Sequence, residues 1–209
     1  MSLLQAPNAT SAPAPSVTPE LFRCTQCGNC CKELFVAVTH RDLQRLQDAT
    51  QTPASSMVTW LPPGAVEIAS AAGQFLLTAE GLRLMVLAHE SGACRFLSAD
   101  KRCSVHEHRP LDCQQFPLHV SHRGKVEFLT EARPMPALRL RVLGNVQCEA
   151  EQGESSLVDQ ATRIEAQRAE EVLEYAQLVA EWNRRSRWLE RLRNKKPDLR
   201  EFFGFLDLH

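Results

Sequence analysis

Cys24-Thr-Gln-Cys27-Gly28-Asn-Cys30-Cys31 is the stretch that decides the fold, because it gathers four cysteines into eight residues. Thiols three residues apart can converge on one metal centre when a tight turn brings their sulfur atoms together. Gly28 favours such a turn, since it adopts backbone angles that other residues avoid. Cys30 and Cys31 are adjacent, and on a strand or a helix we expect their side chains to diverge rather than serve one ion together. The stretch therefore predicts a metal centre built on a turn.

Four more cysteines lie further along the chain. They are Cys94, Cys103, Cys113 and Cys148. Eight cysteines allow two four-thiolate sites, or one cluster together with a structural site. The successive spacing of Cys24, Cys27 and Cys30 is that of the first three ligands of a bacterial iron–sulfur run. All eight cysteines are thus candidate ligands, and the candidate cofactor is an iron–sulfur cluster or zinc.

Polar residues accompany the second group of cysteines. Arg109 lies close to Cys113 in the sequence, where a guanidinium is suited to offset the negative charge of thiolate ligands. His106 and His108 also lie there, but polar loop histidines are more often exposed to solvent. We therefore leave both histidines out of the expected ligand set.

Other interpretations of the cysteines stay open. Cys94 or Cys148, taken singly, also fits the role of a small buried apolar residue. A disulfide framework is the alternative if the chain enters an oxidising compartment. Cys27 and Cys30 have the spacing of a redox dithiol, although the sequence around them does not begin like a thioredoxin βαβ unit.

Composition favours a cytoplasmic protein whose fold is helped by a metal. Of the 209 residues 44% are apolar but only 6% aromatic, so we expect something besides apolar burial to support the core. With a net charge of −1, the protein as a whole has no electrostatic attraction to nucleic acid or to an anionic membrane. The first twenty residues lack the basic start of an export signal, and no apolar run is long enough for a membrane helix. Because disulfides are rare in the cytoplasm, metal ligation is the leading explanation of the cysteines.

The order of sequence patterns predicts a small cysteine-rich, metal-centred domain of the α+β class with a long C-terminal helical element. Its parts are a flexible arm over 1–19, the cysteine domain over 20–150 and the helical tail over 151–209. Within the domain, strands are expected over 34–38, 74–78, 125–130 and 138–142. A helix is expected after an N-cap at Thr39, with Asp42 in its first turn. Residues 53–73 are expected to form a loop, and residues 82–89 show helical spacing. The stretch 155–194 has neither Pro nor Gly and reads as one long helix or a helical hairpin.

The end of that helix is basic. Arginines and lysines crowd residues 184–196, with Trp182 and Trp188 among them. One interpretation is a helix that binds a protein partner or touches nucleic acid; the other, which we favour, is a solvated face docked on the domain through its apolar residues. We also expect this helix to be separable from the metal centre, because all eight cysteines precede it.

The cysteine pattern resembles the CxxCxxCC family, also called YkgJ-like cysteine cluster proteins, which are thought to chelate zinc or iron. The resemblance covers about residues 22–150. It rests on Cys24–Cys31, Thr39-His-Arg-Asp42-Leu43, Gly92-Ala-Cys94-Arg-Phe96-Leu97, Cys103-Ser-Val and Arg109-Pro110-Leu-Asp-Cys113-Gln-Gln-Phe116-Pro117. It implies metal binding by the seven cysteines of these motifs, with Cys148 carried over more weakly. The chain departs from the family at His106, where Tyr is common, and at Gln114, where Arg is common.

The functional expectation is a cytoplasmic protein that binds a metal ion or cluster, with no membrane partner and with nucleic acid disfavoured. One alternative is an iron–sulfur-dependent protein-modifying enzyme, because flagellin lysine methylases look similar across the same cysteine blocks; those chains are much longer, and their additional part is absent here. The other alternative is a scaffold with a structural metal and a partner-binding helix. The sequence shows no nucleotide-binding glycine loop or hydrolytic signature, so whether the chain is an enzyme stays open.

Overall fold

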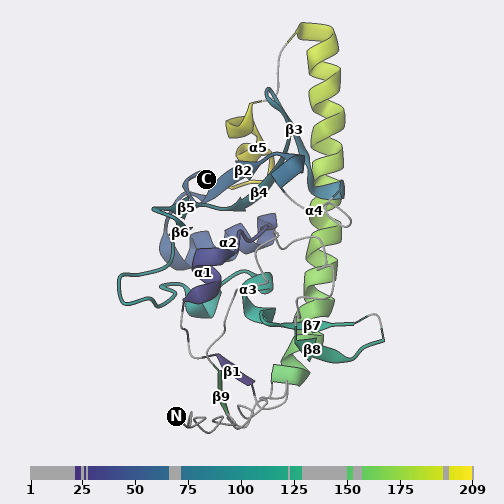
Figure 1. Cartoon of the computed structure of the whole chain (residues 1–209). Helices are drawn as coiled ribbons and strands as arrows, with labels where there is room; N and C mark the ends of the chain where they lie inside the picture. Colours follow the sequence, from purple (N-terminus) through teal and green to yellow (C-terminus); the bar gives the residue numbers. More distant parts are fainter. Residues whose placement is uncertain are drawn as a thin grey trace, which may run out of the picture.

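The computed structural model describes residues 22–24, 26, 28–65, 72–121, 123–128, 150–152, 157–194 and 198–208. Most of the short helices and antiparallel strands lie along one side of a long C-terminal helix, α4 (Leu157–Arg193), as Figure 1 shows. The predicted α+β class and the long C-terminal helix are both confirmed. The arm over 1–19 and the strand expected over 138–142 lie outside the described residues.

The main sheet is built around β4 (Gly81–Leu87), which pairs antiparallel with β2 (Val58–Leu61) on one side and with β3 (Leu76–Thr78) on the other. Four consecutive residues of β4, Leu84 to Leu87, are buried. The segment over 34–38 is extended and mostly buried, as predicted, but it joins β4 only through an isolated bridge. Its backbone bonds are Leu87 N–H to Val36 O at 2.8 Å and Val38 N–H to Met85 O at 3.3 Å.

Two expectations about this sheet are wrong. Residues 82–89 were expected to be helical, because Leu82, Met85, Val86 and His89 follow helical spacing, yet they form β4 and begin β5 (His89–Glu90). Leu84 and Val86 pack into one apolar cluster and Met85 and Leu87 into another, so β4 is covered on both faces. Its unbroken apolar run then imitates a helix in the sequence. The loop expected over 53–73 contains β2, a strand that Pro53, Pro62 and Pro63 concealed by bounding it closely.

The helix α2 (His40–Thr50) begins as the sequence predicts. Thr39 is its N-cap, and the Asp42 backbone N–H donates to the Thr39 hydroxyl while the Asp42 carboxylate accepts from the Thr39 backbone N–H. This reciprocal pair satisfies two donors that the first turn of a helix would otherwise leave without partners. Leu43 and Leu46 on the inner face of α2 are fully buried in the core.

The long helix shares this core. Tyr175, Val179 and Trp182 of α4 are buried with Leu43 and Leu46, and Phe202 from α5 (Leu199–Phe205) packs against Trp182 with ring centroids 5.2 Å apart. The Trp182 indole N–H also donates to the Leu77 carbonyl at 3.2 Å. Removing this helix would therefore open the common core. That the cysteine-bearing part keeps its metal without the helix stays a prediction.

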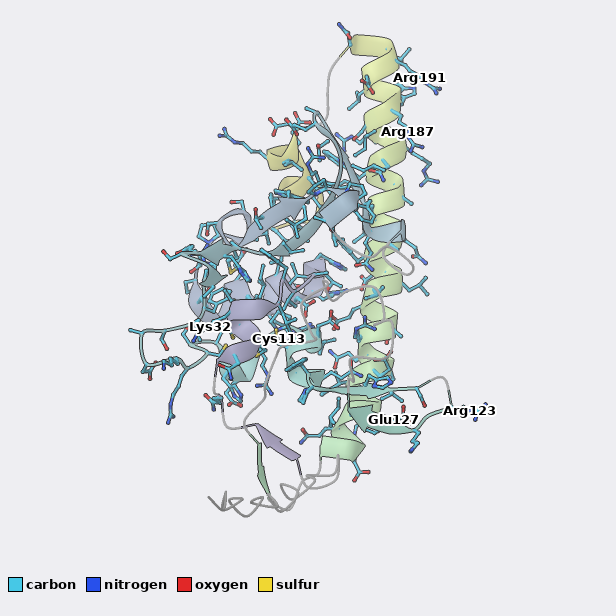
Figure 2. The ribbon with its side chains drawn as sticks, viewed as in Figure 1. Lys32, Cys113, Arg123, Glu127, Arg187 and Arg191 are labelled. Carbon is cyan, nitrogen blue, oxygen red and sulfur yellow. The ribbon has the colours of Figure 1, made fainter. Side chains whose placement is uncertain are left out.

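The basic end of α4 is exposed, and the side chains of Arg187 and Arg191 point away from the body of the protein in Figure 2. The two tryptophans of this region differ: Trp182 is 3% exposed, whereas Trp188 is 55% exposed. Trp182 thus belongs to the docked face, and a protein partner for the remaining surface stays a prediction. Among the described residues, no helix combines the length and apolar character needed to cross a membrane.

The remaining short elements place the cysteines. They are β1 (Phe22–Cys24) paired with β9 (Ala150–Gln152), α1 (Asn29–Glu33), the hairpin of β5 with β6 (Ala93–Cys94), α3 (Leu111–Gln115), and the hairpin of β7 (Leu118–Val120) with β8 (Val126–Phe128). The strand expected over 125–130 is confirmed by β8 as far as those residues are described. The strand expected over 74–78 is confirmed in its C-terminal part by β3.

Candidate metal centre

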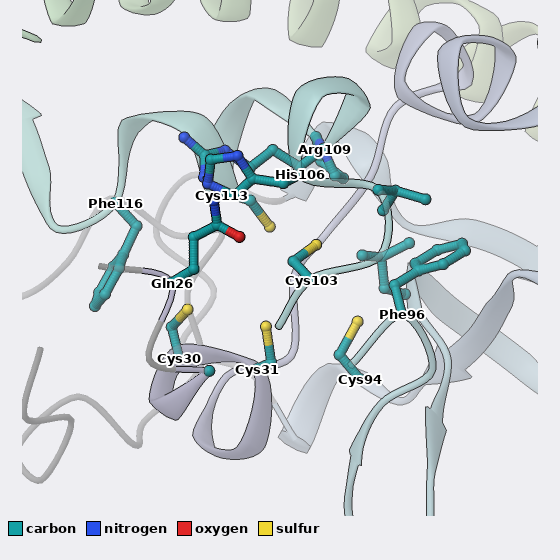
Figure 3. Close-up of a pocket in the computed structure, with 14 residues that line it drawn as sticks. Gln26, Cys30, Cys31, Cys94, Phe96, Cys103, His106, Arg109, Cys113 and Phe116 are labelled. Atoms are coloured by element: carbon teal, nitrogen blue, oxygen red, sulfur yellow. The ribbon is translucent and has the colours of Figure 1, made fainter. Parts of the chain in front are cut away.

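Five cysteines from four segments of the chain line one cavity of about 60 Å³. They are Cys30 and Cys31 on α1, Cys94 on β6, Cys103 in the loop that follows, and Cys113 on α3. Figure 3 shows their sulfur atoms directed into the space that the labelled residues surround. A smaller pocket of about 30 Å³ is lined by four of the same cysteines and by His89. No disulfide joins the five, as far as the chain is described.

The other three candidate ligands are less fully placed. Cys24 ends β1, where only its backbone is described, opposite Ala150 of β9. Cys27 and Cys148 lie outside the described residues. The structure therefore brings together five of the eight cysteines and leaves the roles of Cys24, Cys27 and Cys148 as predictions.

Gly28 directs Cys30 and Cys31 into the cavity. Its φ of 75° is left-handed, one of the backbone conformations that other residues avoid, and it is the N-cap of α1, two residues before Cys30. A second reason for glycine was not visible in the sequence: a Cβ at this position would lie 2.5 Å from the carbonyl oxygen of Lys101. Glycine is thus needed both for the turn and for the close approach of the 97–103 loop.

The side chains of Cys30 and Cys31 were expected to diverge, but they do not. Both line the same cavity, because they occupy the first turn of a helix whose N-terminal end faces it. A hydrogen bond with the Cys31 thiol lowers the pKa of Cys30 to about 7, with a smaller contribution from Arg109, while the pKa of Cys31 is raised by the same bond and by burial. The pair therefore offers one thiol that ionises readily beside one that holds its proton.

Cys94 and Cys103 are brought to the cavity by a tight loop between them. The Leu97 N–H donates to the Cys94 carbonyl at 2.9 Å, and the Ser104 N–H donates to the Phe96 carbonyl at 2.8 Å. An isolated antiparallel bridge pairs Leu97 with Cys103. These backbone bonds fold the chain back on itself and give both cysteines a fixed place on the cavity wall.

Cys113 is positioned by charged residues on the two flanking helices. The Leu111 N–H at the start of α3 donates to Oδ1 of Asp42 on α2 at 3.1 Å. Asp112 Oδ1 accepts from Nε of Arg168 on α4 at 2.6 Å. Asp42 in turn bonds Arg45, whose other contact is Glu171 of α4. Cys113 thus sits on a short helix clamped between α2 and α4.

A comparison with known families agrees with this arrangement. The family model CxxCxxCC, described as a "putative zinc- or iron-chelating domain", matches residues 23–135, more than half of the chain. The chain belongs to the CxxCxxCC family. All five cavity cysteines fall within the matched range, together with Cys24 and Cys27, whereas Cys148 and α4 lie beyond it. No curated protein and no solved structure matches the chain.

The electrostatics of the cavity lined by the five cysteines favour binding of a positively charged metal. Burial raises the pKa of Cys94 to about 11 and holds the pKa of Cys113 well above 9. Several thiolates cannot ionise side by side in such a site without a compensating charge, which a metal would supply. The donor set therefore fits a thiolate-bound metal.

Arg109 and His106 form one wall of this cavity (Figure 3). The Arg109 guanidinium bonds Nε2 of His106, and because arginine only donates, Nε2 must accept. The other ring nitrogen, Nδ1, lies 3.1 Å from Oε1 of Glu107. Both ring nitrogens of His106 thus have polar partners, and its exclusion from the ligand set stays a prediction. Arg109 Nε is buried and has no hydrogen-bond partner among the described residues.

The thiols surround the cavity without converging on one point. Within the described part of the chain, no three His, Cys, Asp or Glu side chains are drawn together tightly enough to hold a single ion. The five cysteines nevertheless share one space. This arrangement provides sulfur donors distributed around a volume rather than a preformed tetrahedron.

Sequence reasoning missed several residues of the site, among them Gln26, Phe116 and His89. Gln26 and Phe116 line the larger cavity, and His89 lines the smaller one. In the sequence, Phe116 is only part of a family motif, and no pattern singles out Gln26. His89 could have been found from a correct strand assignment, because it lies opposite Cys94 in the β5–β6 hairpin.

Proposed function

We propose that this protein binds iron as an iron–sulfur cluster in the thiol-lined cavity, with zinc as the alternative metal. The observation that carries the proposal is the gathering of five cysteines from four separate segments around one space. Iron–sulfur clusters are held by cysteine thiolates that bind different irons from different sides. Membership of a family described as chelating zinc or iron supports metal binding by the same residues.

The size of the cavity favours a cluster over a single ion. A buried water needs roughly 10–15 Å³ of such space, and this cavity offers about 60 Å³. A zinc ion held by four thiolates lies between sulfur atoms that nearly touch, so it requires no comparable void. Thiols distributed around this larger volume therefore support a cluster of several atoms rather than a single ion.

The chain's own residues have distinct roles in this proposal. Cys30, Cys31, Cys94, Cys103 and Cys113 are the candidate ligands that line the cavity. Cys24 and Cys27 are proposed as further ligands from the family match, and Cys148, outside the match, is the weakest candidate. Arg109 offsets the charge of the ligands from the cavity wall. When bound, a cluster would supply one-electron redox capacity to this site.

The thiols also support a reducing location. Five reduced cysteines close together would be prone to form disulfides in an oxidising compartment. We therefore propose that the protein works in the cytoplasm, where thiols stay reduced and remain competent to bind metal.

The proposal is tested by changing each cavity cysteine to Ser and measuring iron, zinc and acid-labile sulfide per chain after purification without oxygen. Each change should lower the bound metal, with Cys113→Ser among the most severe because its helix is held rigidly. Ser104→Ala is the matched control, since it lies beside Cys103 and removes one hydroxyl bond to the Phe96 carbonyl without removing a thiol. Unaltered metal content in all five cysteine variants would refute the proposed site.

A further inference from the structure

His89 is the histidine beside the cavity whose surroundings resemble those of a metal ligand. It lies directly opposite Cys94 in the antiparallel β5–β6 pair. Residues opposite each other in such a pair project from the same face of the hairpin. The imidazole accordingly lines the smaller pocket together with Cys30, Cys31, Cys94 and Cys113.

The tautomer of His89 is fixed by the protein. Its Nε2 lies 3.1 Å from the carbonyl oxygen of Leu34. A carbonyl oxygen only accepts, so Nε2 must carry the hydrogen, and Nδ1 is left with the lone pair. No described residue donates a hydrogen bond to Nδ1. Metal-bound histidines characteristically donate their other ring N–H to a backbone carbonyl or a carboxylate, which is the arrangement found here.

The orientation of the ring is fixed as well. The Phe35 ring stacks on it with centroids 4.1 Å apart and an interplanar angle of 21°. Leu34 and Phe35 directly follow α1, and the Leu34 N–H bonds the Cys30 carbonyl at 3.0 Å. The segment that carries two cavity cysteines therefore also holds the imidazole in place, so the histidine and these thiols are positioned by one piece of backbone.

We propose that Nδ1 of His89 is a ligand of the metal centre, giving it mixed sulfur and nitrogen coordination. The inference rests on the proposed metal-binding function and adds a nitrogen donor to its sulfur ligands. Imidazole binds both iron and zinc, so the assignment holds for either metal. If the centre is a cluster, replacing a thiolate by a neutral imidazole at one iron raises its reduction potential.

The test is X-ray absorption at the K-edge of the bound metal, with the full-length protein purified without oxygen. The outer atoms of a coordinated imidazole ring give a scattering pattern that thiolates lack. The wild-type protein should show this pattern, and His89→Gln should lose it and bind the metal at least about tenfold more weakly in chelator competition. Gln keeps an amide donor for the Leu34 carbonyl but offers no imidazole lone pair.

Two further variants make the outcome decisive. His108→Gln, at an exposed histidine near the cysteines, should keep the imidazole pattern. His89→Cys should restore metal content with an all-sulfur pattern, which separates a ligand from a residue that merely shapes the fold. Metal bound by the wild type without imidazole scattering, or scattering that persists in His89→Gln, would overturn the inference while leaving the proposed function intact. A wild-type protein that binds no metal would overturn both.

Discussion

Arg168 of α4 donates from Nε to Oδ1 of Asp112 at 2.6 Å, and Asp112 directly precedes Cys113 in α3. Both side chains are well shielded, with exposed fractions of 14% for Arg168 and 7% for Asp112. The long C-terminal helix, which lies outside the family match, thus holds the short helix that carries a cavity thiol. This contact links the stability of α4 to the geometry of the proposed metal centre.

Removing the arginine of this pair should destabilise the protein. Arg168→Met leaves the Asp112 carboxylate buried without its cation, which we expect to cost about 3 kcal/mol of unfolding free energy. Urea unfolding measures the loss. Arg163→Met, at an exposed position of the same helix, should change the unfolding free energy by less than about 0.5 kcal/mol. Equal stability of the Arg168 variant and the wild type would show that the pair does not brace α3.

The two tryptophans of α4 offer a matched test of the shared core. Trp182 is buried and Trp188 is exposed. Trp182→Ala should lower the unfolding free energy by about 3–5 kcal/mol and reduce metal retention, because the core that supports the cysteine segments is opened. Trp188→Ala should leave both nearly unchanged. If Trp182→Ala kept full metal content despite lost stability, the helix would be separable from the centre after all.

Gly28 and Gly124 separate the cost of backbone strain from that of crowding. Both have a φ of 75°, but a Cβ at Gly124 meets nothing within 4 Å, whereas one at Gly28 meets the Lys101 carbonyl oxygen. Gly124→Ala should cost about 1–2 kcal/mol for the left-handed conformation alone. Gly28→Ala should cost clearly more and should weaken metal binding, as measured by thermal unfolding and metal analysis. Equal effects of the two changes would mean that the close contact does not matter.

Acid should destabilise the metal-free protein through His40. Burial lowers the pKa of His40 below its ordinary value of 6.5, against the opposing influence of Glu174, and its Nδ1 has no hydrogen-bond partner among the described residues. As pH falls below about 6.5, the unfolded chain takes up this proton before the folded one does, so stability present at pH 7.5 is lost. Urea unfolding at pH 7.5 and 5.5 measures the change.

The comparison for that experiment is His40→Gln, which should show a smaller loss between the two pH values than the wild type. His108→Gln, at an exposed position, should retain the wild-type loss. Metal-free protein is required, because protonation of thiolate ligands would add a second acid-dependent term. Identical losses in the wild type and His40→Gln would contradict the assignment to His40.

The features that the sequence predicted well are governed by local chemistry. The N-cap at Thr39 depends on Asp42 three residues away, and the turn at Gly28 depends on that residue's own backbone freedom. The long helix follows from many residues of high helix propensity without Pro or Gly. In each case the deciding interactions lie within a few residues of each other along the chain.

The features that the sequence did not predict depend on distant partners. β4 imitates a helix in the sequence because its apolar run reflects neighbours on both faces of the strand, and no local signal names them. Cys30 and Cys31 share a cavity with Cys94, Cys103 and Cys113, which lie far from them along the chain. His89 became a candidate ligand only when the strand pairing set it opposite Cys94.

The most direct test of the central claim is elemental and spectroscopic analysis of the full-length protein, purified without oxygen from iron-replete cells. If the protein binds an iron–sulfur cluster, it should be brown and should contain iron and acid-labile sulfide in matching amounts. It should also give an electron paramagnetic resonance signal when the cluster is in a paramagnetic oxidation state. Colourless protein that carries stoichiometric zinc and no sulfide would contradict the iron–sulfur assignment and leave zinc as the bound metal. Protein with neither metal under these conditions would contradict the metal centre itself.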